Sequence, residues 1–213
     1  QAGQLQEAEE LYRRILNHEP HHPEATHMLG LLALQSGKPE TALELLETAI
    51  QLDNSNPVSH ANQGTAYFLL GRPTEAEASF RRALELEQDY VDALANLGKI
   101  LEDQGRLQES RDHLQHAVDL GLQDSNTLAA LAQNYCSLGE LQQAEELASA
   151  AARKTPVEPR AWAVMVRTLL HKGDAKQALS WAEELLRMEP EVQEYLDLLH
   201  QARRQAGQEG RYH

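Results

Sequence analysis

The 213-residue sequence has one cysteine, 5% aromatic residues and no apolar run of 18 residues. The lone Cys136 excludes an internal disulfide and leaves the redox compartment undetermined. Without a long apolar run, no segment is expected to span a membrane. The compartment stays open at this point, with a cytoplasmic location favoured. Positive charge is also scarce, since 19 Lys and Arg stand against 33 Asp and Glu. Because binding to phosphate polyanions needs clustered positive charge, we expect no nucleic-acid partner.

Glycine, in contrast, recurs every 34 residues along the chain, at positions 3, 37, 71, 105, 139, 173 and 207. A small residue follows each of the first six glycines by five places: Ala8, Ala42, Ala76, Ser110, Ala144 and Ala178. Two small residues held in one phase over six copies indicate a supersecondary unit stacked on itself. Such a repeat buries its core between neighbouring units, so we expect function at a binding surface.

Each unit is predicted to contain two helices. Residues 91–104 carry apolar side chains three and four apart, Gly105 ends that helix, and residues 108–120 resume the spacing. The same pattern predicts pairs at 57–70 with 74–87, 125–138 with 142–154, and 159–172 with 176–188. Gly30, Gly64, Gly98 and Ala132 precede the turn by seven residues, where a small side chain lets the paired helices approach closely.

On these residues the chain resembles the tetratricopeptide repeat family, with its best copies at 29–50, 63–84 and 97–118. The resemblance covers essentially the whole chain. It implies an all-α, right-handed α-solenoid of antiparallel helix pairs with a 34-residue period. Val166 and Leu185 stand where the family has small residues, so the last full unit is expected to pack more openly.

The repeat phase predicts four segments. Residues 1–22 form a partial first repeat with only its second helix, and residues 23–192 form five full repeats. Residues 193–206 form a capping helix or the first helix of a truncated repeat, and 207–213 form a tail. The apolar face of 4–17 is expected to be covered by residues upstream of Gln1, and self-association through an exposed repeat end is a further expectation.

The resemblance implies that the first helices line a concave groove, which holds an extended peptide or helix of a partner protein. The family's positions predict these peptide-binding residues: Leu31, Leu34, Asn62, Thr65, Phe68, Asn96, Lys99, Gln133, Arg160, Arg167 and His171. His27 is also expected to line the groove. The groove is therefore expected to be apolar at its first end, polar in the middle and basic at its far end.

Two features of this lining favour a peptide ligand. Asn62 and Asn96 lie 34 residues apart, and exposed amides both donate to and accept from a peptide backbone. The repeat arrays of O-linked N-acetylglucosamine transferases are similar, with an asparagine ladder. Arg160, Arg167 and His171 share one helix face that suits a carboxylate. In both cases, a solvated polar face without a specific role is the alternative.

Other chemistries of the family and of enzymes are not expected. The dicarboxylate clamp of cochaperones does not match, because His27, Leu31, Asn62, Asp92 and Asn96 occupy its places. Histidines cluster without converging ligands, so neither a metal nor a cofactor is predicted. Cys136 is expected at the groove edge with His171 one unit away, but no oxyanion site or third group accompanies them. We therefore predict no catalytic residue and no enzymatic activity.

Three functional hypotheses follow. The leading one is a protein–protein interaction scaffold. The second rests on the opening repeats, which resemble the N-terminal arrays of bacterial proteins fused to sulfo-, glycosyl- or methyltransferase domains. The chain would then be a substrate-recruiting arm, with its catalytic domain beyond residue 213. The third is an assembly factor for a cell-envelope machine, which requires an export signal upstream of Gln1.

Overall fold

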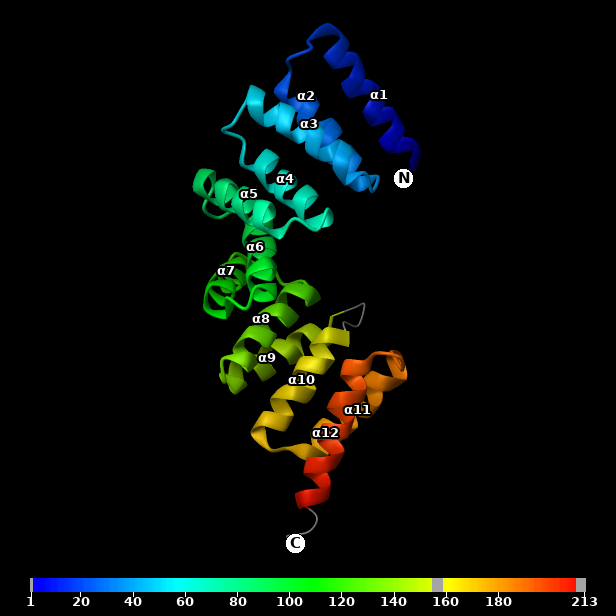
Figure 1. The fold of residues 1–213 in the computed structure, drawn as a ribbon, viewed down its shortest axis with the longest axis vertical. Coiled ribbons are helices and arrows are strands. Elements are labelled where there is room, and N and C mark those ends of the chain that lie inside the picture. Colours follow the sequence, from blue (N-terminus) through cyan, green and yellow to red (C-terminus); the bar gives the residue numbers. More distant parts are fainter. Residues whose placement is uncertain (1, 155–158, 210–213) are drawn as a thin grey trace. The chain divides into compact units, whose positions relative to one another are not determined.

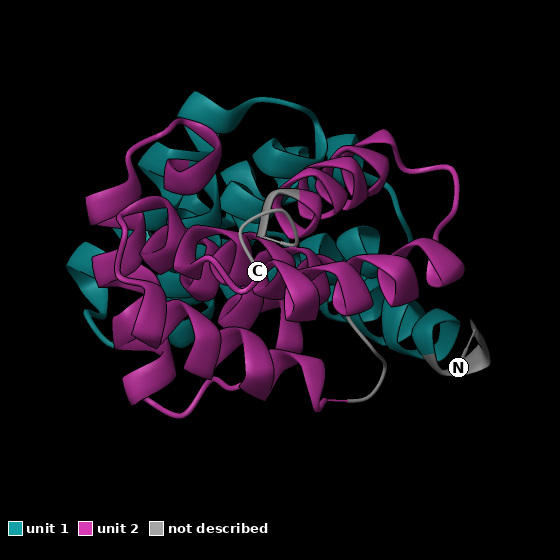
Figure 2. Cartoon of the chain, turned by 90° about the horizontal axis from the view of Figure 1, so that it is seen from below, with its two compact units in different colours: residues 1–100 teal, residues 101–213 magenta. Residues whose placement is uncertain are grey.

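The computed structural model describes residues 2–154 and 159–209. In that part the chain forms twelve α-helices and no strand. It divides into two compact units, Gln1–Ile100 and Leu101–His213, which are coloured separately in Figure 2. The chain is thus an all-α helical repeat, as the 34-residue period predicted.

Figure 1 labels the helices in chain order. They are α1 (Ala2–His18), α2 (Pro23–Gln35), α3 (Pro39–Leu52), α4 (Pro57–Leu69), α5 (Pro73–Leu86), α6 (Val91–Asp103), α7 (Leu107–Asp119), α8 (Ser125–Ser137), α9 (Leu141–Ala152), α10 (Pro159–Lys172), α11 (Ala175–Met188) and α12 (Gln193–Glu209). The predicted bounds are confirmed to within two residues, except that α12 continues past residue 206. None of the described helices is long and apolar enough to cross a membrane.

The turn glycines end the first helices by adopting left-handed backbone conformations. Gly71, for example, has φ +69°, and the next backbone N–H, that of Arg72, donates to the Tyr67 carbonyl at 2.9 Å. This backbone hydrogen bond satisfies a carbonyl at the C-terminal end of α4. Proline at position 73 then starts α5. Gly121, with φ +101°, ends the second helix α7 in the same way and lies outside the 34-residue phase.

The small residues allow close helix pairing, as predicted. A Cβ added at Gly64 would lie 2.9 Å from Cε1 of Phe80, and one added at Gly30 would lie 2.8 Å from Cγ of Leu46. Contacts under 3.0 Å are not tolerated by real Cβ atoms, so α4 with α5, and α2 with α3, pack at the limit set by glycine.

The expectation of open packing around Val166 and Leu185 is wrong, because both side chains are 0% exposed. Ala182 explains the difference. It lies at the position that Leu46 and Phe80 occupy in earlier repeats, and it belongs to the same buried cluster as Val166. The larger residue on the first helix is thus matched by a smaller one on the second helix, which keeps the core filled.

Candidate functional site

Four of the predicted groove residues line one small pocket in the first unit. Thr65 and Phe68 come from α4, Asn96 and Lys99 come from α6, and Phe80 of α5 completes the lining. The pocket has a volume of about 50 Å³. A single water needs about 10–15 Å³ by this kind of measure, so the pocket accommodates a short aliphatic side chain.

The chemistry of this pocket combines an apolar surface with two polar groups. The Phe68 ring is 48% exposed at the end of α4, which is unusual for a phenylalanine. The Thr65 hydroxyl donates to the Ala61 carbonyl at 3.1 Å, so its remaining capacity is to accept. Asn96 supplies an amide and Lys99 an ammonium group. An apolar side chain followed by a carbonyl or carboxylate fits this combination.

The asparagine pair is less exposed than the sequence predicted. Asn62 and Asn96 are both half-buried. The Nδ2 atom of Asn62 is shielded from solvent and has no hydrogen-bond partner. The expectation that both amides are exposed is therefore wrong, because each side chain is half-buried. The amide nitrogen of Asn62 is thus not available to a ligand in this arrangement.

The residues predicted for the first end of the groove are partly or largely buried. Leu31 and Leu34 are half-buried on α2, and Leu34 packs against the cluster around Leu46. His27, which was expected to line the groove, is 6% exposed and lies in the lining of a hollow of about 450 Å³. Its Nδ1 lies 2.8 Å from the Ser59 hydroxyl oxygen. Burial lowers the pKa of His27, and the nearby Glu24 only partly opposes this shift.

The basic far end of the groove, in the second unit, is neutralised by carboxylates. Arg160 pairs with Glu102 at 2.5 Å, and Arg167 pairs with Glu194 of α12 while donating to the side chain of Gln133. Burial lowers the pKa of Arg167, and burial raises the pKa of Glu102 although Arg160 opposes it. The expectation of cations free to receive an anionic ligand is wrong, since each arginine already has an acidic partner.

Cys136 was expected at the groove edge but is only 2% exposed. Its sulfur lies 3.6 Å from Nδ1 of His171, whose side chain is exposed on α10. The structure thus brings the two residues together, while the thiol itself is enclosed in the hydrophobic core of the second unit. In the described chain, no group of three His, Cys, Asp or Glu residues is placed to hold a metal ion.

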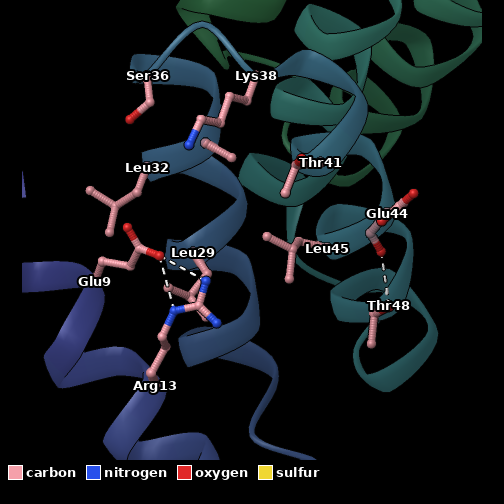
Figure 3. Close-up of a pocket in the computed structure, with 11 residues that line it drawn as sticks. Glu9, Arg13, Leu29, Leu32, Ser36, Lys38, Thr41, Glu44, Leu45 and Thr48 are labelled. Atoms are coloured by element: carbon pink, nitrogen blue, oxygen red, sulfur yellow. Dashed lines mark hydrogen bonds and ion pairs between the residues drawn. The ribbon is translucent and has the colours of Figure 1, made fainter. Parts of the chain in front are cut away.

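A larger hollow lies among α1, α2 and α3, on a surface that the sequence did not single out (Figure 3). Its volume is about 460 Å³. Leu29, Leu32 and Leu45 form an apolar lining, and the ion pair between Arg13 and Glu9 stands at its α1 side (Figure 3). The furrow runs between two consecutive second helices, with the first helix α2 as its floor.

The second unit contains an equivalent furrow of about 610 Å³ among α9, α10 and α11. Corresponding lining residues lie four repeats apart: Glu9 and Glu145, Leu29 and Met165, Ala33 and Leu169, Thr41 and Gln177, Leu45 and Trp181. The repeat itself therefore generates this hollow. The signal that could have revealed it is the large apolar residue eight positions after the turn glycine, which the repeat does not bury completely.

Comparisons with known proteins match this architecture. The family model described as "Cilia and flagella-associated protein 70 C-terminal domain", a tetratricopeptide-repeat domain, matches residues 1–210. No curated protein sequence matches the chain.

Among solved structures, PilF of Pseudomonas aeruginosa is similar, with a TM-score of 0.79, 20% identity and coverage of 92% of this chain and 90% of that one. YrrB, described as a TPR protein with an unusual peptide-binding site, has a TM-score of 0.76 and 20% identity over 87% of this chain and 96% of its own. PilW, described as a type IV pilus biogenesis factor, has a TM-score of 0.71 and 20% identity, covering 93% and 92%. At such identities the likeness establishes a shared fold.

Proposed function

The chain belongs to the tetratricopeptide-repeat family, whose members are typically non-catalytic scaffolds for protein interaction, and on that premise we propose that it binds an extended peptide segment of a partner protein. The pocket lined by Thr65, Phe68, Asn96 and Lys99 is the proposed anchor site. YrrB, a structural neighbour described as having a peptide-binding site, supports this type of ligand by analogy.

The observation that carries the proposal is the half-exposed Phe68 ring beside two polar side chains. An exposed aromatic residue next to an apolar hollow is the usual composition of a binding hot spot. In the proposed complex, a short aliphatic side chain enters the pocket and the Asn96 amide bonds to the peptide backbone. The Lys99 ammonium faces a carboxylate or a carbonyl.

The remaining predicted groove residues have secondary roles in this proposal. Leu31 and Leu34 extend the apolar surface on α2, and the half-buried Asn62 side chain offers a further polar group. In the second unit, Gln133, Arg160, Arg167 and His171 provide hydrogen bonds more than net positive charge, because both arginines are already paired. The hypothesis that the repeats recruit substrate for a fused transferase stays a prediction.

Peptide selection from a random library, followed by affinity measurement on variants, tests the proposal. Phe68→Ala should lower the affinity for the selected peptides by roughly 30-fold, which is the effect of truncating a hot-spot residue. Leu69→Ala is the matched control, since Leu69 is adjacent, 55% exposed and absent from the pocket lining. Peptides that bind the Phe68 variant as tightly as the unchanged chain, or that depend on Leu69 instead, would contradict the proposed site.

A further inference from the structure

The hollow that His27 lines in the first unit has an acidic and partly apolar surface. It lies where α2 and α4 begin and where α3 ends, and its volume is about 450 Å³. Met28 and Val58 contribute apolar walls, whereas Glu24 and Asp53 contribute carboxylates. No lysine or arginine belongs to its described lining, and neither carboxylate has a basic partner elsewhere in the described chain. The hollow therefore carries negative charge that the protein itself does not compensate.

His27 adds a third hydrogen-bonding group to this hollow. Its Nδ1 is occupied by the Ser59 hydroxyl, whereas its Nε2 has no hydrogen-bond partner in the described chain and is not sealed from solvent. Because burial lowers the pKa of His27, the ring is uncharged at neutral pH and does not repel a cation. When Nδ1–H donates to the Ser59 hydroxyl, the lone pair of Nε2 is left to accept from a ligand.

The helix ends around the hollow do not make it an anion site. The N-termini of two helices would ordinarily favour an anion, but here side chains already cap them. The His22 Nδ1 accepts from the Ala25 N–H at 3.2 Å in α2, and the Asn56 Oδ1 accepts from the Val58 N–H at 2.9 Å in α4. The carbonyls of the last turn of α3 add negative partial charge to that of the two carboxylates. A ligand group that donates hydrogen bonds and carries positive charge is therefore favoured.

We propose that this hollow binds an arginine side chain of the partner segment, an inference that rests on the peptide-binding function proposed above. A guanidinium group has several N–H donors and no acceptor, so it matches the carboxylates of Glu24 and Asp53 and the Nε2 of His27. Its aliphatic stem packs against Met28 and Val58. A lysine carries its donors on one nitrogen and reaches fewer of these separate acceptors.

The position of the hollow predicts where the arginine stands in the peptide. Val58 lines the hollow and Thr65 lines the pocket beside Phe68, and both belong to α4. Seven residues place them on one helix face, about 10 Å apart along the axis. The hollow lies toward α2 and the pocket toward α6, so the full span is longer. Since an extended chain rises about 3.3 Å per residue, the arginine should stand about three to five residues from the aliphatic anchor.

Sequencing the peptides selected by the 213-residue chain tests the proposal, and we expect arginine to be enriched at this spacing. Replacing that arginine by glutamine should lower the affinity about tenfold, the effect of losing charge-assisted hydrogen bonds. Glu24→Gln and Asp53→Asn should each lower the affinity for the arginine peptide by roughly fivefold and leave that for the glutamine peptide unchanged. Glu40→Gln is the matched control, because it removes the same charge from an exposed residue outside the lining.

A second measurement tests the hollow without any selected peptide. The chain is titrated with the capped amino acid Nα-acetyl-arginine N-methylamide while the imidazole nitrogens of its histidines are followed by NMR. The Nε2 signal of His27, identified by its loss in His27→Gln, should shift and saturate at millimolar concentration. The corresponding glutamine derivative should leave the signal in place, and Glu24→Gln should weaken the response to the arginine derivative.

The outcomes separate this inference from the proposed function. Selected peptides that depend on Phe68 but show no preference for arginine overturn the inference and leave the anchor pocket standing. Peptides whose arginine depends on Glu24 and Asp53 but not on Phe68 support the hollow and contradict the anchor pocket. An equal effect of Glu40→Gln indicates long-range attraction by net charge and overturns the inference. If no peptide is selected, the titration decides, since an unmoved His27 signal also overturns it.

Discussion

The pairing of Gly64 with Phe80 predicts a specific pattern of coupled substitutions. In Gly64→Val the new Cβ would start 2.9–3.0 Å from three atoms of the Phe80 ring, which is itself only 1% exposed. The ring must shift to accept the new side chain, so overpacking should lower the free energy of unfolding by about 1–3 kcal/mol. Phe80→Ala alone creates a cavity and should cost about 3–5 kcal/mol.

The double variant Gly64→Val/Phe80→Ala reproduces the pair that the chain already uses at Val166 and Ala182. There the valine and the alanine are both 0% exposed, so this combination fills the space between a first and a second helix. We therefore expect the double variant to lose less free energy of unfolding than the two single variants lose in total. The difference, which is the coupling free energy, should be about 1–3 kcal/mol.

Urea unfolding followed by circular dichroism measures the stability of the four proteins in this double-mutant cycle: the unchanged chain, the two single variants and the double variant. Gly207→Ala serves as a control, because no atom lies within 4 Å of a Cβ added in this part of α12. Replacing a helical glycine there should stabilise the chain by roughly 0.5–1 kcal/mol. If the single costs of Gly64→Val and Phe80→Ala add to within about 0.5 kcal/mol, the volume-matching argument is refuted.

Two further predictions concern buried polar groups. Because His27 has a pKa lowered from its ordinary value of 6.5, the unfolded chain takes up its proton at a higher pH than the folded chain does. The free energy of unfolding should thus fall as pH drops below 6.5. Urea unfolding at about pH 7.5 and at about pH 5.5 measures this fall, which should be smaller in His27→Gln than in the unchanged chain. Ser110→Ala removes the hydroxyl oxygen that accepts from the buried Asn134 amide at 2.6 Å, which should cost about 1–3 kcal/mol in chemical denaturation. Ser149→Ala on the half-buried side of α9 should change stability by less than about 0.5 kcal/mol, and an equal cost at both serines would contradict the role of the buried bond.

The helices were readable from the sequence because their signals are local. A turn glycine ends each first helix through its own left-handed backbone, and apolar spacing marks the buried face over a few residues. Four residues of the pocket beside Phe68 were predicted as groove lining from the family resemblance, since a repeat position fixes which face of a helix a residue occupies. The furrows between second helices were missed because half-buried residues such as Leu45 and Trp181 follow the same spacing as the core.

The 34-residue period by itself therefore determined the all-α repeat, the helix bounds and the positions where small residues are needed. Tertiary structure alone decided which side chains meet across helices distant in sequence. Glu102 and Arg160 are 58 residues apart, and their pairing, like that of Arg167 with Glu194, depends on the reach of two long side chains. The burial of His27 and of the Asn62 amide likewise depends on neighbouring helices. Backbone periodicity specifies a face for each residue, whereas partners and exposure depend on the volume and charge of everything packed against that face.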